Sequence, residues 1–282
     1  MVPIEKFHEA VLSGRYETPS DGHPAKPLPM GLRSWWRFYL DGIVRAMRVG
    51  KRVIREGGWR PGLFGDLAFV VTKAVESTGA TISFDGFDAL APYKGKPMVL
   101  VANHMSLVET MVLPAGLFAV NDMTVIAKRS LTKYPVFGKI LASFHPILLD
   151  RKNPRKDLAD TLSQGVDLLK EGISILLFPQ GHRLEVFDPG VFNSLGAKLA
   201  ARAGVPLVPI ACRTDLARPG RIVKDFGPID PSRPVRFSCG PVIPPDTPQR
   251  EMQEKCIEHI VSALTGWGMK VKRQETEDVK GN

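Results

Sequence analysis

A histidine and a carboxylate stand five residues apart in the segment NHMSLVE, residues 103–109. The segment follows an apolar run at residues 98–102 that predicts a strand, so His104 falls in the loop beyond that strand and Glu109 in the first turns of a helix. A hydroxyl group needs a base to attack a thioester, and imidazole, with an ordinary pKa of about 6.5, suits that task. A neighbouring carboxylate would fix the imidazole tautomer and stabilise the imidazolium ion. The pair therefore predicts a base and its orienting acid.

The same two residues also allow a purely structural interpretation. Ser106 and Glu109 have the spacing of a helix capping box, in which the carboxylate accepts from backbone N–H groups. A histidine beside a helix start is often only a packed or capping residue. The spacing alone leaves both interpretations open.

A second group, PQGHR, follows the strand predicted at residues 173–178. Gly181 permits a tight turn that exposes backbone N–H groups, and Arg183 offers a planar fork of donors that suits a phosphate. The residues before the glycine, Pro179 and Gln180, either border an oxyanion site or close a plain turn.

A third group, HPILLDR at residues 145–151, ends another predicted strand with an arginine. Arg151 is therefore a second candidate for binding a phosphate. The alternative is a local ion pair between Asp150 and Arg151, which would contribute little.

Short apolar runs alternate with helical patterns from residue 80 onward. Strands are predicted at residues 81–84, 98–102, 123–127, 147–149, 173–178, 207–211 and 235–238. Helices are predicted at residues 107–118, 155–170, 192–203 and 249–264. This alternation predicts an α/β fold with a central, largely parallel or mixed sheet flanked by helices, and an active site beyond the carboxyl ends of the strands.

An amphipathic helix is predicted at residues 33–56, and a second apolar-faced helix at residues 64–77. The apolar stripe of the first helix is Trp35, Tyr39, Ile43, Met47, Gly50 and Ile54. Its opposite face is rich in arginine. Residues 33–60 hold eight Lys or Arg and two acidic residues, a net charge of +6 within a chain whose net charge is +9.

A helix with these two faces suits the headgroup region of an anionic membrane, where each basic residue contributes about 1 kcal/mol. The residues expected to contact the membrane surface are Trp35, Trp36, Arg37, Arg45, Arg48 and Arg52. The alternative is a helix that packs on the protein core and leaves a solvated basic face.

The 282 residues divide into four predicted regions. These are an extended proline-rich lead-in (1–31), a membrane-surface helix pair (32–79), an α/β domain (80–268) and a polar C-terminal tail (269–282). No apolar run reaches the roughly 18 residues that cross a bilayer, and the start MVPIEKFHEA lacks the apolar stretch of a secretory signal. Three separated cysteines without C-x-x-C spacing predict reduced, structural thiols. We therefore expect a cytoplasmic protein, peripheral on the inner face of the membrane.

Four ordered blocks, NHMSLVET, LLDRKNPR, LLFPQGHR and GVPLVPIA, resemble those of the glycerolipid acyltransferases, the family of 1-acylglycerol-3-phosphate acyltransferases. The stretch AKRSLTKYPVFGKIL, before the second block, is also similar to that family. The resemblance covers roughly residues 82–243, and four blocks in order are far more specific than one. It implies a glycerolipid acyltransferase-like fold and transfer of an acyl group to a lysophospholipid hydroxyl, with 1-acylglycerol-3-phosphate giving phosphatidic acid.

The resemblance also implies roles for individual residues. His104 would be the base and Glu109 its orienting acid, while Arg151, Gly181 and Arg183 would hold the glycerol phosphate. No metal and no bound cofactor are implied, because the acyl group comes from acyl-CoA or acyl carrier protein. The N-terminal helix pair resembles the membrane-docking helices of some relatives.

Three positions depart from the family pattern. The first block usually ends in Asp, where this chain has the longer Glu109. The third usually reads P-E-G-T-R, and here Gln180 and His182 replace the Glu and Thr, which removes a negative charge and adds an imidazole beside the phosphate site. After that block the family often has F-K-x-G, whereas this chain has Asn193 after the phenylalanine, so a phosphate-binding lysine is missing there or supplied elsewhere.

Several other functions stay open on the sequence. The chain would fit a non-catalytic lipid- or acyl-carrier-binding relative, or an acyltransferase for another lysolipid such as an amino-acid lipid. A hydrolase lacks its G-x-S-x-G turn, and a metal site built from His104, Glu109, His145 and His182 lacks H-E-x-x-H spacing. Nucleic acid is not expected as a partner, because the arginines back a Trp-bearing apolar stripe and no nucleic-acid fold signature is present.

Overall fold

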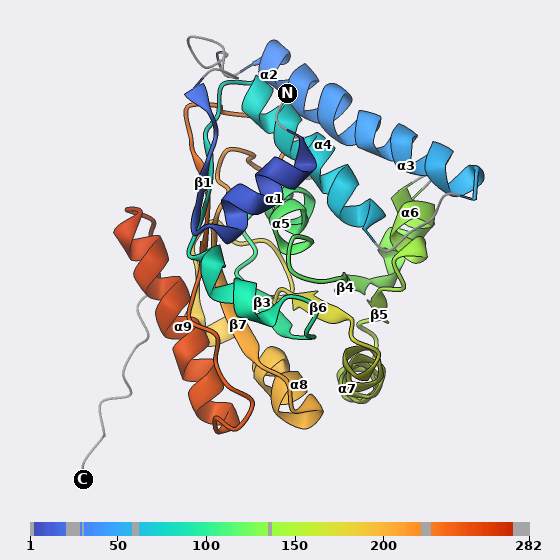
Figure 1. Cartoon of the computed structure of the whole chain (residues 1–282), viewed down its shortest axis with the longest axis vertical. Coiled ribbons are helices and arrows are strands. Elements are labelled where there is room, and N and C mark those ends of the chain that lie inside the picture. The colour runs from blue at the N-terminus through green and yellow to red at the C-terminus, as the bar shows by residue number, and fades with distance from the viewer. Residues whose placement is uncertain are drawn as a thin grey trace.

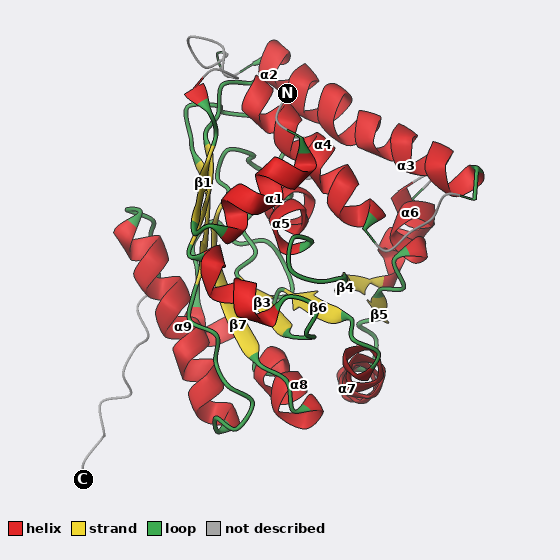
Figure 2. Cartoon of the chain, viewed as in Figure 1, coloured by secondary structure: helices red, strands yellow, loops and turns green. Residues whose placement is uncertain are grey.

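The computed structural model describes residues 3–20, 29, 31–57, 62–134, 137–220 and 227–272. In this part of the chain eight strands form one sheet in the order β1-β2-β8-β7-β3-β6-β4-β5 (Figure 1; Figure 2). The strands are β1 (Arg15–Glu17), β2 (Ile82–Asp85), β3 (Val99–Ala102), β4 (Met123–Lys128), β5 (Ile147–Leu149), β6 (Ser174–Leu177), β7 (Leu207–Arg213) and β8 (Val235–Cys239). All neighbours are parallel except the β1–β2 and β7–β8 pairs. The prediction of a largely parallel or mixed sheet is confirmed, and each of the seven predicted strands is present.

Helices cover both faces of the sheet (Figure 1). The helices are α1 (Ile4–Leu12), α2 (Leu32–Trp36), α3 (Arg45–Arg55), α4 (Leu63–Ser77), α5 (Val108–Leu117), α6 (Phe137–Ser143), α7 (Pro154–Lys170), α8 (Leu195–Ala203) and α9 (Gln249–Gly266). A π-helical segment, η2 (Arg37–Val44), joins α2 to α3, and three short 3₁₀ segments are η3 (Phe87–Tyr93), η4 (Arg129–Lys133) and η5 (Pro189–Val191).

Strand β3 shows why the central strands are continuous apolar runs. Leu100 and Ala102 pack in the core cluster that contains α1, α4 and α5, while Val99 and Val101 pack in the cluster that contains α7, α8 and α9. Successive side chains of a strand point to opposite faces, so a strand covered on both faces needs apolar residues at every position. All four residues of β3 are buried.

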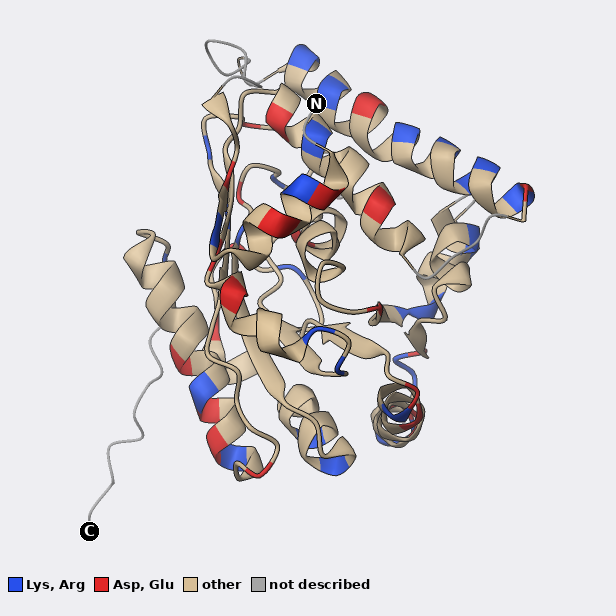
Figure 3. Cartoon of the chain, viewed as in Figure 1, with Lys and Arg blue, Asp and Glu red and all other residues tan. Residues whose placement is uncertain are grey.

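The N-terminal helix runs unbroken through α2, η2 and α3, close to the predicted bounds. Its predicted apolar stripe faces the protein, because Tyr39 and Ile43 are buried and Gly42 lies against Ala74 of α4. The expectation that this stripe enters the membrane is therefore wrong. The alternative of a helix packed on the core describes the stripe, while the basic residues lie along the outward surface (Figure 3).

Two predictions at the chain ends need correction. Residues 1–31 were expected to be an extended lead-in, but they contain the helix α1, which buries Phe7 and Val11, and the strand β1, which pairs with β2. The prolines that suggested an extended segment begin only at Pro19, and residues 21–28 and 30 lie outside the described residues. The tail expected from residue 269 begins with residues that still pack on the core, since Val271 bridges to Phe187. Residues 273–282 lie outside the described part.

The three cysteine side chains lie in the core. Cys212, Cys239 and Cys256 are buried and unpaired, and burial raises the pKa of each thiol. Among the described residues, no helix has both the length and the apolar character needed to cross a bilayer.

The crossing of α4 and α5 supplies a test of the packing. A Cβ atom added at Gly65 would lie 2.6 Å from the Cβ of Phe118, which follows α5. We predict that Gly65→Ala lowers the free energy of unfolding by about 1–3 kcal/mol, because the helices must separate. The control is Gly266→Ala, whose Cβ meets no atom within 4 Å and which should be neutral or stabilising. Urea unfolding followed by circular dichroism measures both, and equal midpoints for the two variants would contradict the close packing.

Candidate active site

The predicted base and acid meet at the carboxyl end of β3. His104 Nδ1 lies 2.7 Å from Glu109 Oε1, and the imidazole ring stacks on Phe178 with ring centroids 4.6 Å apart. The side chain of His104 is 16% exposed, whereas that of Glu109 is fully buried. A carboxylate only accepts hydrogen bonds, so Nδ1 must donate, and Nε2 of the neutral ring is left as the basic atom.

Glu109 also satisfies the backbone at the start of α5. Oε1 accepts from the N–H groups of Met105 at 2.6 Å and Ser106 at 2.8 Å, so the capping and the orienting roles exist together. Oε2 accepts from the hydroxyl of Thr214 at 2.6 Å. Burial alone would raise the pKa of the Glu109 carboxyl, but hydrogen bonds from His104 and Thr214 and the charge of His104 outweigh it, and the pKa lies below its ordinary value. The carboxylate is therefore ionised at neutral pH.

Two residues that hold this loop were not assigned a role from the sequence. Thr214 follows β7, so the same rule that placed His104 beyond β3 would have pointed to it. Asn103 uses its side-chain amide to pair with both the N–H and the carbonyl of Cys212, at 2.7 and 2.8 Å, and thereby continues the β3–β7 pairing beyond the end of β3. The loop that carries His104 is thus tied to β7 at two points.

Gln180 lies behind the same loop. Its Oε1 accepts from the backbone N–H of His104 at 2.7 Å, and the residue is only 5% exposed. The backbone N–H of Leu184 donates to the carbonyl of His104 at 2.9 Å. The segment after β6 therefore positions the backbone of His104 from both sides, and an amide at position 180 accepts this bond as a carboxylate would.

The segment after β6 forms a tight turn. Gly181 has a φ of 70°, a left-handed conformation that favours glycine, and its N–H donates to the carbonyl of Phe178 at 3.0 Å. Pro179 has no N–H to offer, and its carbonyl accepts from the side-chain amide of Asn193. The turn interpretation therefore describes Pro179 and Gln180, and the N–H of Gly181 is engaged in the turn and not directed at an oxyanion.

Arg151 reaches this turn from the end of β5. Its Nη2 donates to the carbonyl of Gly181 at 2.5 Å, and its backbone N–H donates to Asp157 at 2.7 Å while its φ is 59°. The alternative ion pair between Asp150 and Arg151 is wrong, since the carboxylate of Asp150 pairs with Arg129 at 2.6 Å. Arg151 is therefore held beside Gly181, as the phosphate-binding hypothesis requires.

An apolar cavity of about 370 Å³ opens beside His104. Five predicted site residues line it: His104, Arg151, Pro179, Gly181 and Arg183. The rest of the wall is largely apolar and includes Tyr39, Ile43, Met47, Phe64, Leu67, Met111, Leu131, Ile140 and Phe144. The N-terminal helices and α6 thus contribute apolar walls to this cavity, and the imidazole and two guanidinium groups contribute polar ones.

His182 does not join this group. The residue is exposed and does not line the apolar cavity, so the expectation that it adds an imidazole beside the phosphate site is not met in this structure. Within the described residues, no three His, Cys, Asp or Glu side chains converge in a way that would hold a metal ion. The four residues considered for a metal site therefore form no such cluster.

Comparison with known proteins agrees with this geometry. Residues 82–213 match the family model Acyltransferase. The 1-acyl-sn-glycerol-3-phosphate acyltransferase of Pseudomonas aeruginosa is 40% identical over 116 residues, 41% of this chain and 44% of that protein. A probable 1-acyl-sn-glycerol-3-phosphate acyltransferase of Mycoplasma genitalium is 32% identical over 119 residues, again 41% of this chain and 44% of that protein. The matches span less than half the length of these two relatives.

A solved structure shares the fold of nearly the whole chain. The 1-acyl-sn-glycerophosphate (LPA) acyltransferase PlsC of Thermotoga maritima superposes with a TM-score of 0.58, covering 86% of this chain and 97% of that chain at 18% identity. The predicted glycerolipid acyltransferase-like fold is thereby confirmed. The segment that matches the Acyltransferase model carries His104, Glu109 and both candidate arginines, so the residues singled out in the sequence lie within the part of the chain that is similar to acyltransferases.

Proposed function

We propose that the protein transfers a fatty acyl group from acyl-CoA or acyl carrier protein to the hydroxyl of a lysophospholipid, with 1-acylglycerol-3-phosphate as the acceptor and phosphatidic acid as the product. One observation carries the proposal. His104, held by the buried carboxylate of Glu109, lines an apolar cavity that is also lined by Arg151 and Arg183.

The chemistry follows from the free nitrogen of the imidazole. Nε2 of His104 removes the proton of the acceptor hydroxyl as its oxygen attacks the thioester carbonyl, and the ionised Glu109 stabilises the imidazolium ion that forms. The tetrahedral intermediate then collapses, the carbon–sulfur bond breaks, and the leaving thiolate takes the proton back from His104. The reaction needs no acyl-enzyme, no metal and no bound cofactor.

The two kinds of wall in the apolar cavity suit the two ends of a lipid. Apolar side chains from η2, α4 and α6 would exclude water from an acyl chain, which gains about 0.8 kcal/mol for each buried CH₂ group. Arg151 and Arg183 would bind the phosphate of the acceptor, because guanidinium groups pair with phosphate oxygens in two-point geometry. The hydroxyl between these ends would then lie near His104.

The outward face of the N-terminal helix supports docking on an anionic membrane. Arg45 and Arg48 are exposed and form no ion pair within the described ranges, while Arg37 and Arg52 pair with neighbours on the same helix. Trp36 is 52% exposed on this helix, and Trp35 is partly buried beside Tyr39. We place the protein at the inner face of the cytoplasmic membrane, bound through this basic face and not through the buried stripe.

The base is tested by substitution. His104→Ala should lower transfer by at least about 100-fold without weakening the binding of lysophospholipid vesicles, because general-base catalysis contributes about 10²–10⁴. Glu109→Gln should lower kcat more than it raises the acceptor KM, since the carboxylate acts chiefly on the imidazolium ion. His182→Ala, at an exposed position outside the apolar cavity, is the control and should stay active. Thiol release from acyl-CoA measures all three, and an active His104→Ala enzyme would exclude this base.

Thr214 gives a second test of the same network. Thr214→Val removes the hydroxyl that donates to Glu109, and a hydrogen bond to a charged group contributes about 1.5–3 kcal/mol, so kcat should fall by about 10- to 100-fold. Thr214→Ser keeps the hydroxyl and should restore most of the activity. Steady-state kinetics and thermal unfolding of both variants separate an effect on the site from loss of the fold. Equal kcat values in the Val and Ser variants would mean that this bond does not orient the base.

Membrane docking is tested by charge reversal. The triple variant Arg45→Glu, Arg48→Glu, Arg52→Glu should reduce co-sedimentation with phosphatidylglycerol-rich vesicles by about 100-fold or more, at about 1 kcal/mol for each basic residue near the surface. A matched variant reverses three exposed cations at the amino ends of β3, β6 and β7: Lys96→Glu, Lys170→Glu and Arg202→Glu. It should bind vesicles like the wild type. If both triple variants lose binding equally, vesicle binding depends on the net charge of the protein and not on this face of the helix.

A further inference from the structure

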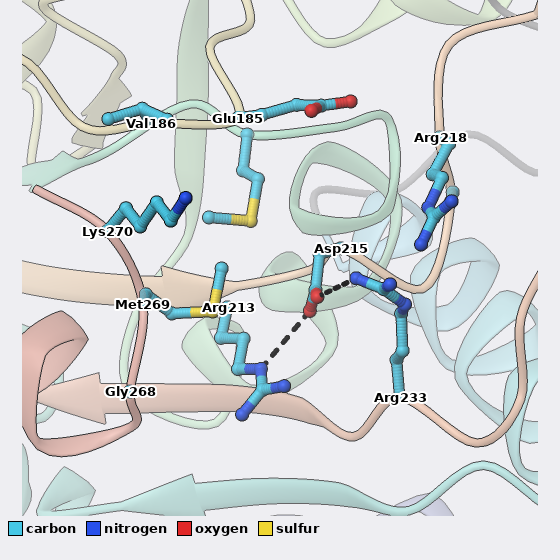
Figure 4. Close-up of a pocket in the computed structure, with 11 residues that line it drawn as sticks. Glu185, Val186, Arg213, Asp215, Arg218, Arg233, Gly268, Met269 and Lys270 are labelled. Carbon is cyan, nitrogen blue, oxygen red and sulfur yellow. Dashed lines mark hydrogen bonds and ion pairs between the residues drawn. The ribbon is translucent and has the colours of Figure 1, made fainter.

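A second cavity, of about 560 Å³, is lined by residues that include Arg213 and Asp215 at the end of β7 (Figure 4). It lies at the carboxyl end of β7, whereas the apolar cavity lies over β4 and β6. In the sheet order β3 stands between β7 and β6, and His104 follows β3. The base therefore sits between two hollows at one edge of the sheet.

A residue next to the base in the sequence lines the second cavity. Met105 lines the cavity and directly follows His104, and its sulfur accepts from the backbone N–H of Thr214 at 3.4 Å. Glu185 also lines the cavity, and it follows Leu184, whose N–H donates to the carbonyl of His104. A ligand in this cavity would thus touch residues adjacent to the base.

The charges that line the second cavity favour an anion. Four cations and two carboxylates face it. Asp215 pairs with Arg213 at 3.1 Å and with Arg233 at 2.5 Å, and Arg233 also pairs with Asp230 at 3.0 Å, so the two arginines are fixed in one partly buried network with two carboxylates. Arg213 is further anchored to the carbonyl of Trp267, at 3.1 Å. A fixed pair of guanidinium groups loses little entropy when it binds a further acceptor.

Two more cations complete the cavity. Arg218 and Lys270 come from opposite sides of it, and within the described residues neither forms an ion pair or a side-chain hydrogen bond (Figure 4). Glu185 contributes one opposing charge, so the lining remains positive overall. The apolar cavity already contains the two arginines suited to the acceptor phosphate, so the cations of the second cavity are available to a different anion.

We propose that the second cavity binds the phosphate of the 4′-phosphopantetheine arm of the acyl donor, an arm that acyl-CoA and acyl carrier protein share. This inference rests on the proposed acyl transfer. The donor has an apolar chain on one side of its thioester and a phosphate on the other. When the thioester lies at His104 and the chain enters the apolar cavity, the arm must leave on the remaining side, where the second cavity begins.

The test uses the double variant Arg218→Gln, Lys270→Gln, which leaves the Arg213–Asp215–Arg233 network in place. The donor KM should rise at least about tenfold, as expected for the loss of one charge-assisted contact, while kcat and the lysophospholipid KM stay near wild-type values. The control is Lys96→Gln, Arg202→Gln, two exposed cations at the opposite edge of the sheet. An unchanged donor KM in an active double variant overturns the proposal.

Competition assays distinguish binding of the donor's phosphate from binding of the rest of the donor. In the wild type 4′-phosphopantetheine should compete with the donor and pantetheine should not; equal competition by both would overturn the proposal. Parallel assays with acyl-CoA and acyl carrier protein show which source uses the cavity, and a KM rise with either one supports it. Calorimetric titration with CoA, without lipid, tests the cavity even if no acyl transfer is found. CoA binding that is lost in the double variant supports the site in that case, and binding that is unchanged refutes it.

Discussion

The buried carboxylate of Glu109 is the constraint around which the site is built. Burying an ionised carboxylate away from water costs several kcal/mol of folding free energy unless the carboxylate is fully hydrogen-bonded. Its donors come from the loop after β3 and from Thr214 beyond β7, so two segments far apart in the sequence must converge on two oxygen atoms of a side chain in α5. They converge only because β3 and β7 are parallel neighbours in the sheet. The orientation of His104 is therefore a property of the sheet as much as of its own loop.

Much of the fold could be predicted because the central strands are buried on both faces and read as unbroken apolar runs. The helix α1 could not, since nine residues form only a marginal helix by themselves, and its stability depends on the packing of Phe7 and Val11 against distant parts of the chain. Amphipathicity shows that a helix has an apolar face but not what covers that face. In the N-terminal helix the protein itself covers Tyr39 and Ile43. Their four-residue spacing, longer than the 3.6 residues of an α-helical turn, fits the wider turns of η2.

Part of the site could be predicted from residues close in the sequence, and part depends on contacts between distant segments. His104 and Glu109 lie five residues apart, so a strand followed by a helix is enough to bring them together. Thr214 is 105 residues from Glu109 and is brought there only by the order of the strands. The replacement of the usual glutamate by Gln180 looked like a change beside the phosphate, but the structure places that side chain under the backbone of His104. The effect of this replacement therefore depends on where the side chain lies in the structure, which the residue type alone does not show.

The apolar cavity has two walls of different origin. One consists of residues near the strand ends of the α/β domain, and the other of Tyr39, Ile43 and Phe64 from the N-terminal helices, which precede the region matched by the family model. The base and this part of the apolar wall thus come from separate stretches of the chain. Under the proposed acyl transfer, substitutions in the N-terminal helices would change which acyl chains fit the cavity without altering the residues around the base, so the two properties could evolve separately.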